Sequence, residues 1–151
     1  MYCLIYRDFF TGSYNITATY AKNGKTYVRT TKLTITDKQP TLSATVKKTS
    51  VELAASTQAD AFVTTSGFIT FSYNGTNVTV EPSDIAKVEG KLKKTDGTIT
   101  DLAKDSELFE SKKTVTATIT KITVAFKVPD TEGLTCEVVV PVDKAFTISG
   151  K

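Results

Sequence analysis

The fold is decided by the alternation within residues 12–35, which run GSYNITATYAKNGKTYVRTTKLTI. Over residues 12–20 every second side chain is apolar, the set being Tyr14, Ile16, Ala18 and Tyr20. A period of two places such a set on one face of a β-strand. Residues 27–35 supply a return strand, and Asn23-Gly24 between them favours the two positive φ angles of a type I′ turn. The stretch therefore predicts a β-hairpin with one apolar and one polar face.

The rest of the chain continues in the same manner. Short strands are expected at 42–46, 51–53, 68–73, 78–80, 87–94, 115–128, 134–142 and 145–148. Turns are expected at Asn74-Gly75, at Pro82–Ile85 and at Asp96-Gly97. Threonine fills 28 positions, and its β-branched, hydroxylated side chain suits a sheet with one solvated face. Together these features predict an all-β fold, an antiparallel β-sandwich.

Three segments depart from simple alternation. Val115, Ala117 and Ile119 share one face, whereas the apolar positions from Ile122 onward have the opposite parity. A slip of this kind predicts a β-bulge near Lys121. Residues 101–109 have no clear period, and we expect either a short helix or a loop lying over the core. Residues 54–66 are small and polar, and no regular element is expected there.

The first hairpin carries a resemblance to a known family. Residues 12–20, then Asn23–Tyr27 and Leu33–Thr36, resemble the last hairpin of bacterial immunoglobulin-like (Big-type) domains, with Gly12 and Tyr14 at the start of the penultimate strand. Such domains occur in surface-layer proteins, adhesins and phage tail or fibre proteins. The resemblance implies an immunoglobulin-like sandwich at 38–151. Residues 1–37 are then the end of a preceding domain or a segment packed on the next one, and we favour packing because an isolated hairpin is marginally stable.

Composition excludes several functional classes. The chain has 19 basic and 16 acidic residues, no histidine and no tryptophan. Without histidine the commonest general base is missing, and we expect the protein not to be an enzyme. The basic residues look scattered, so no nucleic-acid partner is expected. Met1–Phe10 is apolar but too short to span a membrane.

Three sets of residues are candidates for a site. Cys3 and Cys136 could form a disulfide, although two separate buried thiols are at least as plausible. Asp96, Asp101 and Asp105 could share a calcium ion, the one cofactor considered, against the simpler view that they are solvated turn residues. Exposed aromatic side chains could bind a partner, the candidates being Tyr20, Tyr27, Phe71 and Tyr73; cross-strand or core packing is the alternative.

The expected function is a non-enzymatic structural or adhesive module of a bacterial cell-surface, surface-layer-like protein. The expected location is extracellular, on a cell surface or a virion. The partners would be neighbouring domains, copies of the same chain, cell-wall glycan or a host protein. One alternative is a phage or viral structural protein, such as a tail, fibre or capsid-decoration component, assembling through sheet edges or Met1–Phe10. A second alternative is a carbohydrate- or protein-binding sandwich.

Overall fold

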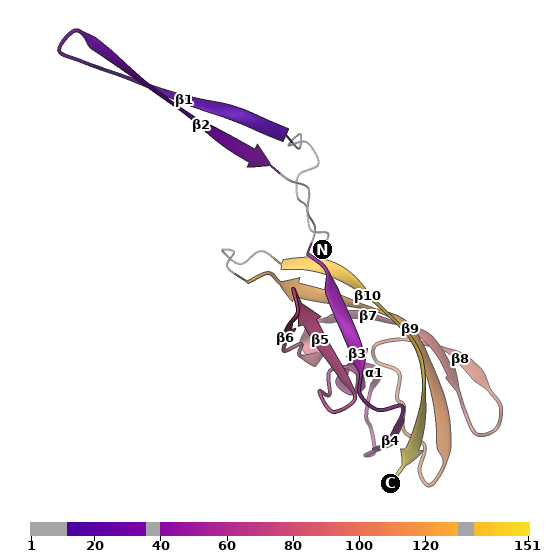
Figure 1. Ribbon diagram of the computed structural model, residues 1–151. Helices are drawn as coiled ribbons and strands as arrows, with labels where there is room; N and C mark the ends of the chain where they lie inside the picture. The colour runs from indigo at the N-terminus through magenta and orange to yellow at the C-terminus, as the bar shows by residue number, and fades with distance from the viewer. Residues whose placement is uncertain (1–11, 36–39, 130–134) are drawn as a thin grey trace. The chain divides into compact units, whose positions relative to one another are not determined.

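The computed structural model describes residues 12–35, 40–129 and 135–151, which belong to two compact units. The first unit contains one hairpin, and the second contains the remaining strands (Figure 1). The boundary that we expected between residues 37 and 38 lies outside the described residues, as does Met1–Phe10. Each unit is described below by itself.

The first unit is the hairpin that the alternation predicts. Strands β1 (Gly12–Lys22) and β2 (Lys25–Ile35) are each 11 residues long and pair antiparallel from Gly12↔Ile35 to Lys22↔Lys25. Asn23 and Gly24 have φ angles of 53° and 72°, as a type I′ turn requires. The predicted hairpin and its turn are therefore confirmed.

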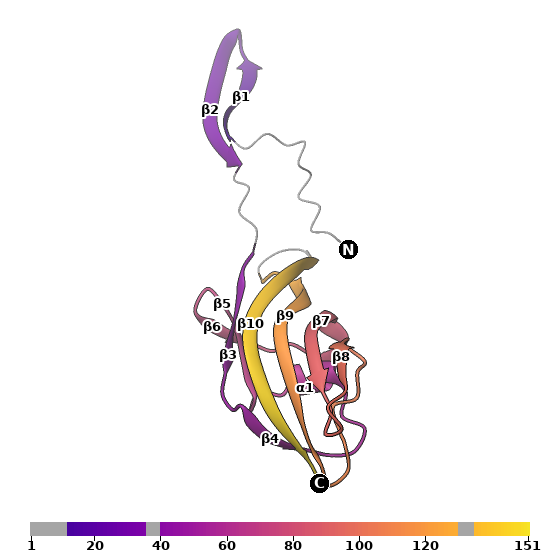
Figure 2. The same ribbon diagram turned by 90° about the vertical axis from the view of Figure 1, so that its right-hand side faces the viewer.

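The second unit is a sandwich of two sheets. The larger sheet has five strands in the order β4 (Ser50–Leu53), β10 (Thr135–Gly150), β9 (Thr114–Lys127), β7 (Ile85–Lys93) and β8 (Ile99–Leu102). The smaller sheet has the order β3 (Leu42–Val46), β5 (Ile69–Tyr73) and β6 (Thr76–Val78). Neighbouring strands are antiparallel except β4, which runs parallel to β10. The two sheets face each other in Figure 2, and the all-β sandwich is confirmed.

One apolar core lies between the sheets. Along β9 the buried residues follow the predicted alternation and its slip, being Val115, Ala117, Ile119, Ile122, Val124 and Phe126. From the other side, Phe62 contributes a ring to the core and packs edge-to-face on Phe146 with centroids 5.1 Å apart. All the side chains buried in the described ranges are hydrophobic. The core is therefore a conventional one, held by burial of apolar surface.

The parity slip corresponds to a bulge, as predicted. The pairing of β7 with β9 shifts register between Glu89 and Gly90, opposite Thr120, and that of β10 with β9 shifts between Pro141 and Lys144. At the bulge, the three neighbouring strands use unequal numbers of residues to pass between the same two layers of the core. The segments run from Val88 to Leu92 on β7, from Ala117 to Ile122 on β9, and from Val140 to Phe146 on β10. Unequal advance bends the sheet locally.

The helix of the sandwich is in a different place from the one we considered. Helix α1 (Ala59–Val63) lies in the segment where no regular element was expected, and the short 3₁₀ turn η1 (Pro82–Asp84) confirms the predicted turn. A helix within 101–109 is wrong: β8 ends at Leu102, and the chain beyond it runs as a loop with Leu108 buried. The alternative of a loop over the core is confirmed.

Hydrogen bonds explain that outcome. The first amides of α1, on Ala59 and Asp60, donate to the carbonyl oxygens of Ser106 and Lys104 at 2.9 Å each. The amide of Leu108 donates to the carbonyl oxygen of Thr57 at 2.9 Å. A helix N-terminus leaves its first amides without internal partners. The loop after β8 supplies those partners. Because these carbonyl oxygens accept hydrogen bonds from α1, and not from amides within the loop, the loop does not form a helix.

Candidate functional site

The hairpin has one face that combines tyrosines with basic residues. Directly paired residues point to the same side of a two-stranded ribbon, so the register assigns the faces. We call one of them the tyrosine face, made up of Tyr14, Ile16, Ala18, Tyr20, Lys22, Lys25, Tyr27, Arg29, Thr31 and Leu33. Tyr20 and Tyr27 are 60% and 55% exposed, and their ring centroids are 6.4 Å apart. The opposite face is rich in threonine, with Thr17 and Thr30 joined through their hydroxyls at 3.1 Å.

The hairpin and the sandwich differ in their balance of charge, although basic residues are present in both. The described hairpin contains four basic residues, Lys22, Lys25, Arg29 and Lys32, and no acidic residue. Residues 40–151, the sandwich segment, contain 13 lysines and 14 acidic residues. The excess positive charge of the chain therefore belongs to the hairpin. A count of charge by segment, in place of one for the whole chain, would have found this signal.

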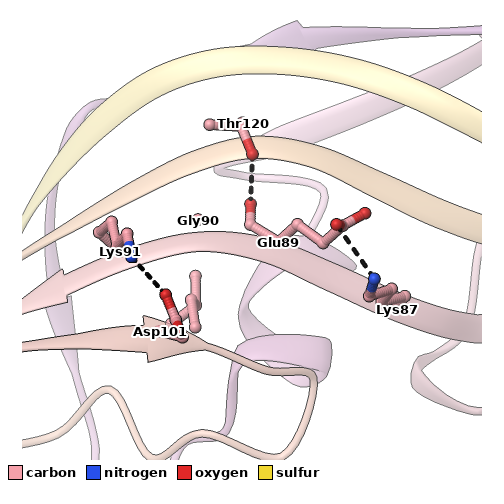
Figure 3. Close-up of a pocket in the computed structure, with 7 residues that line it drawn as sticks. Lys87, Glu89, Gly90, Lys91, Asp101 and Thr120 are labelled. Atoms are coloured by element: carbon pink, nitrogen blue, oxygen red, sulfur yellow. Dashed lines mark hydrogen bonds and ion pairs between the residues drawn. The ribbon is translucent and has the colours of Figure 1, made fainter.

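A second surface is a shallow pocket at the bulge of the larger sheet. It is lined by Lys87, Glu89, Gly90, Lys91, Asp101, Leu102 and Thr120 (Figure 3). The hydroxyl of Thr120 donates to the backbone carbonyl oxygen of Glu89 at 2.9 Å. Gly90 leaves the middle of the pocket without a side chain because its position cannot hold one: an added Cβ would lie 1.9 Å from the carbonyl oxygen of Thr118. The pocket is thus a consequence of strand packing at the bulge.

The charges lining this pocket are paired. The Glu89 carboxylate lies 3.0 Å from the amine of Lys87, and Asp101 is paired with Lys91 (Figure 3). The amine of Lys121 lies 3.4 Å from the same Glu89 carboxylate. The hydrogen bond from Lys87 is the main cause that lowers the pKa of Glu89. The hydrogen bond from Lys91 lowers the pKa of Asp101 in the same way. Both carboxylates are therefore ionised at neutral pH, so neither is suited to donate a proton there.

These ion pairs predict how the stability of the fold depends on pH. A carboxyl group whose pKa is lower in the folded chain stabilises the fold above its unfolded pKa, and the contribution is lost as the pH falls through the folded pKa. The pKa values of Glu89 and Asp101 are lowered from ordinary values of 4.5 and 3.8. We expect E89Q/D101N to unfold at lower urea concentration than the unmodified protein at pH 7. The difference should shrink as the pH is lowered below about 4.5 towards 2. A difference that stays constant over this range would contradict the assignment.

The structure separates the three aspartates proposed for calcium. Asp96 caps its turn by accepting a hydrogen bond from the amide of Thr98 at 2.8 Å, while Asp101 is paired with Lys91. Asp105 is exposed in the loop after β8. Within the described residues no group of three or more potential metal-binding side chains comes together.

The structure describes one of the two cysteines and all four of the candidate aromatic residues. Cys136 is buried and engaged in a disulfide bond. The other cysteine of the chain, Cys3, lies outside the described residues, so the Cys3–Cys136 pairing stays a prediction. Phe71 is 3% exposed in the core, and Tyr73 packs on Phe126 with centroids 5.1 Å apart. The alternative of core packing therefore holds for Phe71, which is buried, and Tyr73 is partly buried against the core.

No helix in the described part of the chain is both long and apolar enough to cross a membrane. Comparison of the chain with protein-family models, with curated proteins and with solved structures finds no match.

Proposed function

We propose that the protein is a non-enzymatic structural or adhesive module of a bacterial cell-surface protein, in which the sandwich is the scaffold and the hairpin is the contact element. The observation that carries the proposal is the amphipathic hairpin, whose tyrosine face exposes large apolar side chains such as Ile16 (50%) and Tyr20 (60%). A two-stranded ribbon is marginally stable alone in water. Burial of this face against a partner would stabilise it, with the apolar area as the main driving force.

The strand order of the sandwich supports a relationship with immunoglobulin-like modules. In such domains one sheet contains the strands in the order G-F-C, and a further strand extends it beyond C. Strands β10, β9, β7 and β8 follow this order. Strand β3 pairs with β5 in the opposite sheet, as the first two strands of that fold do.

The mass of the protein in solution tests this proposal against assembly as a phage or viral structural component. We expect light scattering to give a monomer near 16.4 kDa at every concentration, because two hairpins would bring eight positive charges together without an acidic residue. A discrete oligomer would contradict the monomeric module. It would support a virion component if I16K, on the tyrosine face, dissociates it and T17K, on the opposite face of the same strand, does not.

A further inference from the structure

The end of the tyrosine face next to the turn has an ordered arrangement of residue pairs. Starting at the turn, the pairs are Lys22 with Lys25, Tyr20 with Tyr27, and Ala18 with Arg29. Lys22 and Ala18 are four positions apart along β1, a distance of about 14 Å at roughly 3.4 Å per residue. Two exposed tyrosine rings therefore lie between two groups of positive charge. We call these six residues the hairpin tip.

The charge at the tip has no local compensation. Lysines directly opposite each other on neighbouring strands destabilise a hairpin, and the described hairpin has no carboxylate to offset Lys22 and Lys25. An anionic ligand would relieve this repulsion and would form charge-assisted hydrogen bonds with both amines. A second copy of the hairpin would increase the repulsion. The complement of this surface is thus an acidic partner and not another copy of the chain.

We propose that the hairpin tip binds an anionic polysaccharide. Carboxylate or sulfate groups of the polymer would pair with Lys22, Lys25 and Arg29, and the apolar face of a sugar ring would lie on Tyr20 and Tyr27. The inference rests on the proposed role of the hairpin as a contact element and names the chemical class of its partner.

The number of cations distinguishes a polysaccharide from a nucleic acid. Non-specific binding of nucleic acid draws essentially all its affinity from contacts of lysine and arginine with phosphates, and the tip offers only three cations. The two exposed rings are cross-strand neighbours, inclined by 32° with centroids 6.4 Å apart.

Binding of the full chain to polygalacturonate, a polymer of acidic sugars, tests the inference. We expect micromolar to millimolar affinity that weakens with salt, and no binding to the fully methyl-esterified polymer, which has the same sugar rings without the charge. K25Q should lower the affinity about fivefold, and K22Q/K25Q about tenfold or more. K32Q removes one charge from the same strand but from the opposite face, and it should change the affinity less than about twofold.

A second variant separates ring contact from charge. Y27V introduces a β-branched residue, which favours a strand as tyrosine does. It should lower the affinity for polygalacturonate about fivefold, with the far-ultraviolet circular dichroism unchanged. The inference would be overturned if neither K22Q/K25Q nor Y27V lost affinity for polygalacturonate, or if K32Q lowered the affinity as much as K25Q. Tighter binding to a single-stranded oligothymidylate would also overturn it. No binding to polygalacturonate would overturn it as well, yet a monomer by light scattering would leave the proposed function standing.

Discussion

Replacement of Gly90 by alanine is expected to destabilise the sandwich by about 3 kcal/mol, the upper part of the range for overpacked sites. An added Cβ at this position would lie 1.9 Å from the carbonyl oxygen and 2.9 Å from the carbonyl carbon of Thr118. Both are backbone atoms of β9, so the strand itself would have to move away from β7. Alanine would otherwise be favoured over glycine in a strand by roughly 0.5–1 kcal/mol, and the clash outweighs that gain.

Urea unfolding measures this effect, with G67A as the matched control. An added Cβ at Gly67 would meet no atom within 4 Å, so G67A should be neutral or stabilise the fold by about 0.4–1 kcal/mol. G90A should lower the unfolding midpoint without changing the denaturant slope. Equal midpoints for the two variants would show that β7 and β9 are not as closely packed at the bulge as the structure indicates.

The features that sequence predicted correctly are those fixed by neighbouring residues. Asn23-Gly24 and Asn74-Gly75 select their turns because asparagine and glycine tolerate positive φ, and both pairs have positive φ angles in the structure. The bulge was predictable because an inserted residue changes the parity of every buried position after it. In β9 this is the change from Ile119 to Ile122. The type of fold followed from the same local patterns.

The features that sequence did not predict depend on contacts distant along the chain. Helix α1 has five residues, too few to be stable alone, and it forms because Ser106 and Lys104 accept hydrogen bonds from its first amides. Phe71 resembles an exposed aromatic in sequence, but its strand faces the other sheet. Strand β4 pairs with β10, so residues near the start of the sandwich segment lie beside residues near the end of the chain. No local pattern contains that information.

The candidate site shows the same division. The alternation of residues 12–20 is enough by itself to place Tyr14 and Tyr20 on one face of the hairpin. The opposition of Lys22 to Lys25 and of Ala18 to Arg29 required the register, which the turn sets. The bulge pocket was not predictable, because its lining comes from β7, β8 and β9 and depends on how those strands pair.

Truncation of Phe62 to alanine is expected to have an effect as large as any in the sandwich, about 3–5 kcal/mol. Its side chain is fully buried, packs edge-to-face on Phe146 at 5.1 Å and lies 5.3 Å from the ring of Phe68. Because α1 is short, Phe62 and its neighbour Val63 are the main apolar contacts that hold it in place. Removal of the ring therefore opens a cavity and also weakens the docking of the helix.

The double-mutant cycle of F62A with F146L, measured by urea unfolding, isolates the contact between the two rings from the burial of Phe62. If ring contact contributes in addition to burial, the double variant should be less destabilised than the sum of the single variants by about 0.5–1.5 kcal/mol. F68A serves as the control, since Phe68 is only partly buried at the margin of the core and its truncation should cost clearly less. If F62A and F68A cost the same, α1 does not anchor the core through Phe62. Because the hairpin is a separate compact unit, its affinity for polygalacturonate should be unchanged in F62A wherever the sandwich remains folded.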